Sequence, residues 1–572
     1  MKGRILGHSP PIPEKGKKEG ENSTMKKIKV EKENLITIFR PNSKIVGVFH
    51  SVNDELKMEL KNEMVTICRQ VPVIARRFDN VETGKLFYEL HWKEDSTEKT
   101  IVVPAIAIAK KSDLINLAED GLAVNENNCK ALIKFFDRYI AEIKPKSYKM
   151  STRIGHVKGV FIHPNLTSDI SIVPDNEGTR QILDSFREKG TVESWRDEIL
   201  EKVRPFPVIL FMILSSFASV LVYRFGTDPF IVDLSGPTSK GKTTALYIAS
   251  TVWGNKDAIG QWNDTPVNIE RKAEFLNSFP LILDDTKKAV TANPKMFEQM
   301  IYFFSGGQTK GRGKLHGFQA NRTWKNILLS TGESSILSYS EGGGAAGRVV
   351  TIEESPFMDN PDTELLTELY KSIDKHHGVV GKEFIHRLTE MDEAEQEHLE
   401  RMYNDKRLEY NKLNTEGNEV ITRITAYFSL IFIAGGLVNK FFNFNLELDF
   451  IDGFFKKNLK ENAALDKPKQ HLDALLEELD SNRGVIYYEI RPSVIFAIEQ
   501  NGSILLTPRF ISDRLGAEAN AIKKEWKRKG YIIPGRNDEI APTITKNGNS
   551  FRGIMVNPEI VKELGYDFRQ KQ

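Results

Sequence analysis

The chain has 572 residues, a formal net charge of +2, 40% hydrophobic residues and two cysteines. This length exceeds one ordinary domain, and the balanced charge excludes a chain that is basic throughout, so any contact with DNA must come from local patches. The two cysteines, Cys68 and Cys129, are too few for a disulfide framework or a cysteine-rich zinc site, and they fit a reducing cytoplasm.

The first 190 residues predict a tail and a domain. Residues 1–30 are polar and rich in lysine, which indicates a disordered basic arm. Residues 31–190 predict an α+β domain, with a hairpin over 71–92 around the turn DNVETG and a further strand over 101–109. Helical periodicity over 125–143 predicts a helix. No motif here assigns a chemistry, so the task of this domain stays open between contact with DNA and contact with a partner.

An uncharged stretch, FPVILFMILSSFASVLVY, covers residues 206–223 and has the minimum length for crossing a membrane. It contains Pro207 and three serines, and it stands just ahead of a strand that must meet a cytosolic nucleotide. We therefore expect a buried helix packed on a catalytic core, no membrane partner and a cytoplasmic protein.

The stretch FIVDLSGPTSKGKTTALYIAS, residues 230–250, predicts a strand, a phosphate-binding loop and a helix. It fits the pattern G-x-x-x-x-G-K-[ST], in which backbone N–H groups and the helix N-terminus surround an anion. Lys242 would reach the β- and γ-phosphates of ATP, and the Thr243 hydroxyl would hold Mg²⁺. The expected nucleotide-binding residues are Gly236, Pro237, Thr238, Ser239, Lys240, Gly241, Lys242, Thr243 and Thr244.

About 40 residues later, FPLILDDT predicts a buried strand that ends in two acids. Asp284 would hold the Mg²⁺ shell, and Asp285 would polarise the attacking water. Many related ATPases carry glutamate at the second place. Aspartate is one methylene shorter, which places the water closer or makes hydrolysis slower.

Two further segments complete the expected site. The stretch WKNILLSTGE predicts a strand whose carboxyl end presents Ser330 or Thr331 to the γ-phosphate or the water; Asn326 lies at its beginning and is the poorer candidate. In GGGAAGRVVTIEE, Arg348 follows a glycine run and would serve as an arginine finger on a neighbouring subunit, or alternatively form a surface ion pair.

The stretch FFSGGQTKGRGKLHGF predicts a β-hairpin between the acid pair Asp284–Asp285 and the strand that carries Ser330 and Thr331. Three cations alternate with glycines there and suit a sugar-phosphate backbone in the pore of a ring; a mobile surface loop is the plain alternative. The expected DNA-binding residues are Lys310, Arg312 and Lys314.

The remaining sequence gives the domain plan. Residues 191–390 form the nucleotide-binding core, and residues 391–483 a helical connector with a charged helix and an apolar one. Residues 484–572 predict a winged helix, with two helices around Gly516 and two strands around the turn KNGNS. Its second helix carries five cations that suit DNA phosphates, although a plain solvated face has the same composition.

The order of these motifs resembles the AAA+ superfamily, in its branch with a hairpin before sensor 1, which includes the MCM replicative helicases. The chain more closely resembles a bacterial domain-of-unknown-function family of MCM-like ATPases on mobile elements. This resemblance rests on the segments IVDLSGPTSKGKTTAL, FPLILDDT, ILLSTGE and AAGRVV. The best-known members of this family are self-loading helicases of staphylococcal cassette chromosome elements. The P-loop of this chain has Gly-Lys-Thr where MCM proteins have Ala-Lys-Ser. Arg387 is a weak choice for sensor 2.

The resemblance implies an α/β fold with an AAA+ P-loop core, a homo-hexameric ring and translocation on single-stranded or forked DNA with 3′→5′ polarity, for replication of a mobile element. It implies catalytic roles for Lys242, Asp284, Asp285, Thr331 and Arg348. A DNA-binding regulator that assembles with slow hydrolysis and without unwinding is the alternative. A primase–helicase ranks last, because residues 31–190 show no polymerase-like acidic cluster.

Overall fold

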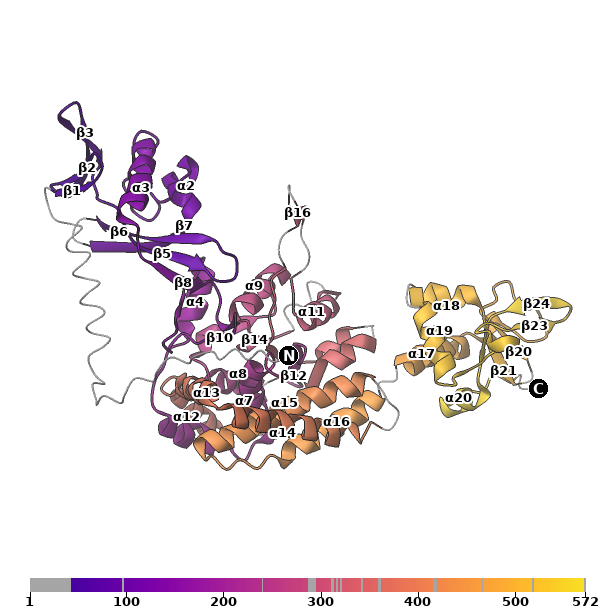
Figure 1. Ribbon diagram of the computed structural model, residues 1–572. Coiled ribbons are helices and arrows are strands. Elements are labelled where there is room, and N and C mark those ends of the chain that lie inside the picture. Colours follow the sequence, from indigo (N-terminus) through magenta and orange to yellow (C-terminus); the bar gives the residue numbers. More distant parts are fainter. Residues whose placement is uncertain are drawn as a thin grey trace, which may run out of the picture. The chain divides into compact units, whose positions relative to one another are not determined.

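The computed structural model describes residues 43–94, 97–238, 240–286, 295–309, 313–314, 317–318, 321–340, 343–358, 362–414, 419–464, 467–500, 502–516 and 519–569 (Figure 1). The expected arm over 1–30 lies outside them. The chain forms two compact units. The first reaches residue 152 and adds 157–162 and 167–175, and the second holds 153–156, 163–166 and the chain from residue 176 onward.

The first unit contains two sheets, ordered β1-β2-β3-β4 and β11-β8-β5-β6-β7. The expected hairpin is confirmed, because β5 and β6 pair antiparallel. The expected strand over 101–109 is wrong beyond Pro104: proline cannot donate to a further ladder bond, and Ala105–Ile108 forms a short 3-10 helix. The strands of these two sheets are β1 (Ser43–Val46), β2 (Phe49–Val52), β3 (Glu55–Leu60), β4 (Glu63–Cys68), β5 (Val73–Asn80), β6 (Leu86–Glu94), β7 (Thr97–Pro104), β8 (Ser147–Ser151) and β11 (Ile170–Ile172). Two short strands, β9 (Gly155–Val157) and β10 (Val160–Ile162), form a separate pair.

Two helices cover this unit, α2 (Lys111–Asn116) and α3 (Cys129–Ile143). The expected helix over 125–143 is confirmed from Cys129 onward. Its apolar face buries Leu132, Phe135 and Tyr139, and these side chains belong to one hydrophobic core with residues of both the sheet and α2.

A five-stranded parallel sheet is the centre of the second unit, in the order β13-β14-β17-β12-β18. Every residue of β12, β14 and β17 is buried, as expected for apolar strands covered on both faces. The order places β17 between β12 and β14, so the three strands expected to carry nucleotide-site residues are neighbours. The strands are β12 (Phe230–Ser235), β13 (Gly260–Gln261), β14 (Leu281–Asp284), β17 (Ile327–Gly332) and β18 (Val349–Ile352).

The apolar stretch 206–223 forms a buried helix, as predicted. Helix α7 (Pro207–Ala218) packs on β17 and on α8 (Lys242–Ser250). The serines of the stretch are satisfied inside the protein: the Ser216 hydroxyl donates to the Ala249 carbonyl at 2.9 Å, and the Ser219 hydroxyl, just beyond α7, donates to the Ser278 carbonyl at 2.8 Å. Helices α9 (Pro266–Leu276) and α11 (Lys295–Ser305) accompany the same sheet.

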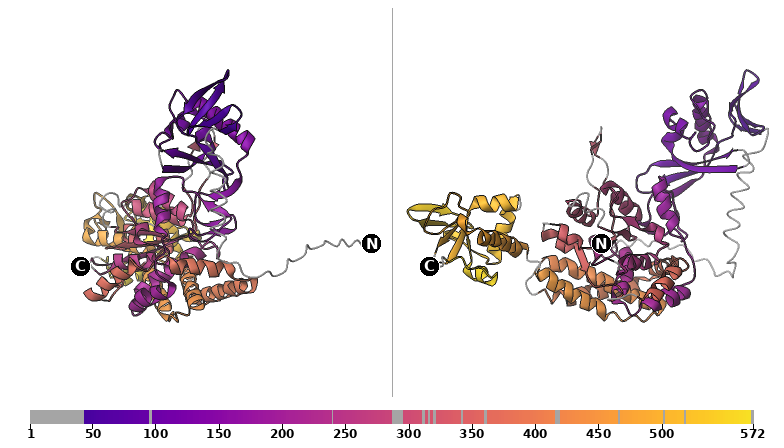
Figure 2. Two further views of the ribbon diagram at one scale, coloured as in Figure 1. Left: turned by 90° about the vertical axis from the view of Figure 1, so that its left-hand side faces the viewer. Right: turned by 180° about the vertical axis from the view of Figure 1, so that it is seen from behind.

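Helices that follow the sheet in the chain pack together beside it (Figures 1 and 2). Within the described residues, Val420–Phe442 is the one helix long and apolar enough to cross a membrane, and 72% of its apolar window is buried. It packs on α7, α14 and α16, which identifies it as a core helix. The helices that follow the sheet are α12 (Thr363–Ile373), α13 (Val379–Glu390), α14 (Glu393–Asn411), α15 (Glu419–Phe442) and α16 (Asp449–Ala464). Helices α4 (Glu177–Ser185), α5 (Val192–Trp195) and α6 (Glu201–Val203) precede it in the chain.

The expected hairpin between α11 and β17 has its root among described residues. The Thr309 N–H donates to the Arg322 carbonyl at 2.8 Å, and the Trp324 N–H donates to the Gly307 carbonyl at 3.0 Å. Trp324 is fully buried, and its ring N–H donates to the Phe304 carbonyl. Beyond the root, β15 (Gly313–Lys314) pairs antiparallel with β16 (Gly317–Phe318). Lys310 and Arg312 lie outside the described residues.

The C-terminal part has its own hydrophobic core around Trp526, Leu476 and Ile504. The two expected helices and the expected hairpin are confirmed as α18, α19, β23 and β24. A sheet in the order β19-β20-β21-β25-β22 packs with them. The bounds are α17 (Lys467–Ser481), β19 (Ile486–Tyr487), β20 (Ala497–Gln500), β21 (Ser503–Leu506), α18 (Pro508–Leu515), α19 (Ala519–Arg528), β22 (Ile532–Ile533), β23 (Thr543–Lys546), β24 (Asn549–Arg552), β25 (Ile554–Val556) and α20 (Pro558–Glu563).

Candidate nucleotide-binding site

The loop from Gly236 to Gly241 joins β12 to α8 at the carboxyl edge of the parallel sheet, where ligands bind in open α/β folds. Gly236 has φ 148° and Gly241 has φ 84°, conformations that L-residues rarely adopt. The Gly236 N–H donates to the Gly332 carbonyl at 3.1 Å, so the loop begins bound to the neighbouring strand. Pro237, Thr238 and Lys240 lie in this loop; Ser239 is outside the described residues.

Lys242 opens helix α8, and its ammonium folds back on the loop. It donates to the Gly236 carbonyl at 2.7 Å and to the Pro237 carbonyl at 2.6 Å. Burial lowers the pKa of Lys242, and nearby carboxylates oppose this effect, Glu333 most strongly, ahead of Asp284 and Asp285. The ammonium therefore lies in a negative environment at the mouth of the loop, where it can accept a polyphosphate as its partner.

Asp284 is the centre of a polar cluster under the loop. The Thr243 hydroxyl donates to its Oδ1 at 3.3 Å, and the Thr331 hydroxyl donates to the same oxygen. Asp284 is 9% exposed. One hydroxyl and one carboxylate, completed by phosphate oxygens and water, form the ligand set that Mg²⁺ prefers, so these residues fit the ion. Thr243 and Asp284 would hold it, and it would neutralise charge on the phosphates.

Asp285 follows the strand with φ 60°, a left-handed backbone that takes its side chain out of the alternation of β14. Its N–H faces the Thr331 hydroxyl at 3.4 Å, and the next N–H, of Thr286, donates to the Thr331 carbonyl at 3.2 Å. Thr331 therefore holds both the Asp284 carboxylate and the backbone that follows the acid pair.

The two sensor candidates separate in the structure. Ser330 points into the core, donates to Asp233 at 2.8 Å and accepts from the Trp262 ring N–H at 3.0 Å. Thr331, on the opposite face of the strand, reaches Asp284. Asn326 is buried at the start of β17 and donates to the Phe279 carbonyl. Of these three, Thr331 is the one that joins the polar cluster.

Asp233, in the middle of β12, was not expected from the sequence as a site residue. Its carboxylate is fully buried, and it also accepts from the Ile336 N–H at 2.9 Å. Burial raises its pKa to about 6, against the hydrogen bonds from Ile336 and Ser330, which act to lower it. The acid thereby ties the P-loop strand to the sensor strand and to the segment that follows it.

A second unexpected residue, Phe357, supports the loop. A Cβ on Gly241 would lie 2.5 Å from the Phe357 ring, which shows how closely the ring approaches the backbone. Phe357 is buried and packs edge-on against Phe206, with ring centroids 5.2 Å apart. Nothing in the sequence signals this contact, because more than 100 residues separate Phe357 from the glycine.

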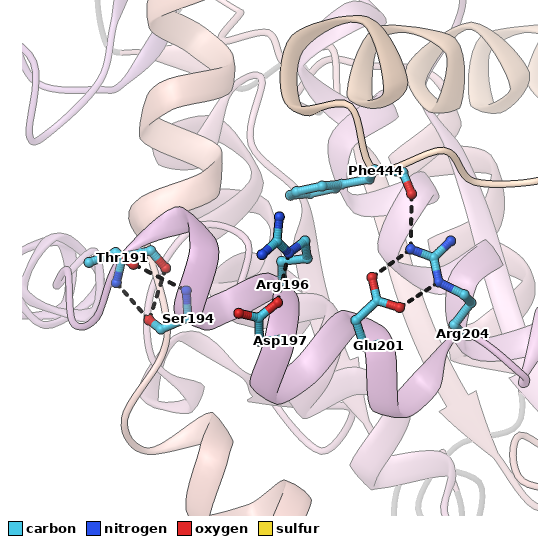
Figure 3. Close-up of polar contacts among 7 residues, drawn as sticks. All are labelled: Thr191, Ser194, Arg196, Asp197, Glu201, Arg204 and Phe444. Atoms are coloured by element: carbon cyan, nitrogen blue, oxygen red, sulfur yellow. Dashed lines mark hydrogen bonds and ion pairs between the residues drawn. The ribbon is translucent and has the colours of Figure 1, made fainter.

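The segment ahead of Phe206 is held in place by its own polar contacts (Figure 3). Thr191 and Ser194 form a reciprocal cap at its start, with the Ser194 N–H donating to the Thr191 hydroxyl at 3.1 Å. At its end the Arg204 guanidinium pairs with Glu201 at 2.6 Å and donates to the Phe444 carbonyl at 2.9 Å. Phe206, and through it Phe357, is thus fixed against the helical layer.

The remaining predicted residues lie apart from this cluster. Arg348 ends a short 3-10 helix, donates to the Gly344 carbonyl and stacks 4.7 Å above the Tyr302 ring. Thr244 faces Tyr370, with 3.0 Å between the two hydroxyl oxygens. Arg387, the weak choice for sensor 2, pairs with Glu383 at 2.7 Å and donates to the Phe441 carbonyl.

A solved helicase structure shares this fold. The structure described as SCCmec type IV Cch, an active helicase, matches 91% of this chain and 99% of its own, with a TM-score of 0.68 and 15% identity. At this identity the likeness establishes a shared fold. One apo structure of the NrS-1 C-terminal region matches 84% of this chain and 96% of its own, with a TM-score of 0.31 and 11% identity. A second apo structure of that region matches 64% of this chain and 90% of its own, with a TM-score of 0.26 and 9% identity. No curated protein sequence matches. Residues 42–324 match the DUF927 family, a domain of unknown function.

Proposed function

We propose that the protein is an ATP-dependent DNA helicase that unwinds DNA during replication of a mobile genetic element. The observation that carries the proposal is the convergence of Lys242, Thr243, Asp284 and Thr331 at the carboxyl edge of one parallel sheet. The fold shared with the active helicase Cch supports it. In this proposal the core is an AAA+ ATPase that acts as a homo-hexamer and moves 3′→5′ on single-stranded or forked DNA.

The residues would divide the work of hydrolysis. The loop N–H groups and the N-terminus of α8 bind the phosphates, and Lys242 leaves the loop carbonyls to reach the β- and γ-phosphates. Thr243 and Asp284 hold Mg²⁺, which neutralises phosphate charge. A carboxylate beside Lys242 polarises the attacking water, and Asp285 is the one expected from the sequence. Thr331 orients Asp284, and Arg348 reaches the γ-phosphate of an adjacent subunit.

DNA contact is assigned to the hairpin, through Lys310, Arg312 and Lys314. Residues 484–572 would contact DNA as a winged-helix domain. Helix α19 buries Ile522 and Trp526 and carries its lysines on other faces, where Lys527 is paired with Asp538 at 2.5 Å. Replacing the three hairpin cations with alanine should leave basal hydrolysis intact and remove its stimulation by DNA. Unchanged stimulation would reject this role.

Strand displacement on a forked DNA with ATP tests the function, with Lys242→Ala as the control. We expect displacement by the wild type and none by the variant, because no other group neutralises the β- and γ-phosphates as closely. A variant that still hydrolyses ATP would reject the P-loop assignment.

An ATP-dependent assembly switch, which binds DNA without unwinding it, is the second candidate. The observation that favours it is Asp285, whose side chain is one methylene shorter than glutamate and whose backbone leaves the strand at φ 60°. DNA binding with slow hydrolysis and no displacement on any fork would favour the switch over the motor.

A further inference from the structure

Glu333 is the first residue beyond β17, and the strand register brings it to the mouth of the P-loop. Ser235 pairs with Gly332, and the Gly332 carbonyl accepts the Gly236 N–H at 3.1 Å. The residue after Gly332 therefore lies beside the first residue of the loop. This position belongs to the strand that also carries Thr331, whose hydroxyl bonds Asp284.

The backbone around Gly332 is packed too closely for a side chain. A Cβ there would lie 2.2 Å from the Thr286 hydroxyl oxygen, so the segment after the acid pair presses directly on the end of β17. This contact brings the ends of β14 and β17 together. Asp285 and Glu333 thus leave the sheet at the same edge, from neighbouring strands.

The two carboxylates are not equivalent. Asp285 lies on a left-handed backbone at φ 60°, and its side chain is the shorter by one methylene. Among the carboxylates that oppose the effect of burial on the pKa of Lys242, Glu333 acts most strongly and Asp285 least. The Lys242 ammonium donates to the Gly236 carbonyl at 2.7 Å, and the Gly236 N–H donates to the Gly332 carbonyl, so Glu333 leaves the sheet beside the residue that holds the ammonium.

We propose that Glu333 is a catalytic residue of ATP hydrolysis, the base that accepts a proton from the attacking water; this inference rests on the function proposed above. The water oxygen forms a bond to the γ-phosphorus, and the bond from that phosphorus to the β,γ-bridging oxygen breaks. The electron pair leaves with ADP, and the water proton passes to the Glu333 carboxylate and then to the phosphate produced. Asp285 then holds the turn after β14.

The test compares three variants in the full-length chain: Glu333→Gln, Asp285→Asn and the control Glu393→Gln. The control makes the same amide change at an exposed carboxylate in the first turn of α14. A fluorescent ATP analogue measures binding, and steady-state hydrolysis measures turnover. We expect Glu333→Gln to bind nucleotide within about threefold of the wild type and to lose about 10²-fold or more in kcat, the range for a general base. Asp285→Asn should lose less, and Glu393→Gln should match the wild type.

Rescue separates a proton acceptor from a structural role. Formate added to Glu333→Ala should restore part of the turnover, because a small carboxylate fills the space that the side chain leaves. Turnover by Glu333→Gln within about threefold of the wild type would overturn the inference, and so would loss of its nucleotide binding or failure of formate to restore activity. A wild type that binds ATP without hydrolysing it would instead reject the proposed function, and the inference with it.

Discussion

Replacing Gly241 with alanine should weaken nucleotide binding, for two reasons that the structure separates. The residue has φ 84°, and an L-residue in the left-handed region costs about 1–2 kcal/mol. The new methyl would also lie 2.5 Å from the Phe357 ring, and overpacking of this kind costs about 1–3 kcal/mol. The sum is at least about 2 kcal/mol, which lowers nucleotide affinity roughly thirtyfold if the loop alone bears the strain.

The assay is equilibrium binding of a fluorescent ATP analogue, with thermal unfolding measured beside it. Gly226→Ala is the matched control, because Gly226 has φ 61° and nothing within 4 Å of its Cβ position, so it bears the backbone cost alone. Adding Phe357→Ala to Gly241→Ala should return about 1–3 kcal/mol by removing the overlap. Wild-type affinity in Gly241→Ala, or no recovery in the double variant, would refute the contact as the support of the loop.

Three further predictions concern the polar groups of the site. Thr331→Ala should lower kcat about 5- to 150-fold, because it removes the buried hydroxyl that donates to Asp284, a loss of about 1–3 kcal/mol, whereas Thr331→Ser should retain activity in the same hydrolysis assay. Arg348→Ala should bind nucleotide and fail to turn over; if mixing it with Lys242→Ala subunits restores no activity at any ratio, action between subunits is not supported. The raised pKa of Asp233, about 6 against an ordinary 3.8, contributes stability that is present below about pH 4 and is lost as the pH rises through about 6, an effect of roughly 3 kcal/mol. The difference in unfolding midpoint between the wild type and Asp233→Asn should therefore fall over this range, and parallel profiles would contradict the assignment.

Local sequence signals predicted much of this architecture. The glycines and the lysine of the P-loop define a turn by backbone chemistry alone, and apolar runs that end in polar residues predicted β12, β14 and β17. The buried α7 followed from its proline and serines. Strand alternation also predicts that only one of Ser330 and Thr331 faces the site, because adjacent residues of a strand point to opposite sides of the sheet.

Features that depend on contact between distant segments were beyond reach. The packing of Phe357 on Gly241 needs the strand after Arg348 to return to the P-loop, and no local pattern encodes that approach. In the sequence, Asp233 is a single polar residue in an apolar run, and nothing there predicts that its carboxylate is buried. Glu333 ends the segment WKNILLSTGE, but its electrostatic effect on Lys242 arises because β12 and β17 are neighbouring strands.

The root of the hairpin is continuous with β17, and this has a mechanical consequence. Trp324 anchors the root, and three residues later the strand begins that carries Thr331. The strand is hydrogen-bonded on both sides, by β12 and β14, and an extended chain at about 3.3 Å per residue has no slack to take up. In the proposed function, a load that DNA places on the hairpin would therefore reach Thr331 and Asp284 through one extended strand.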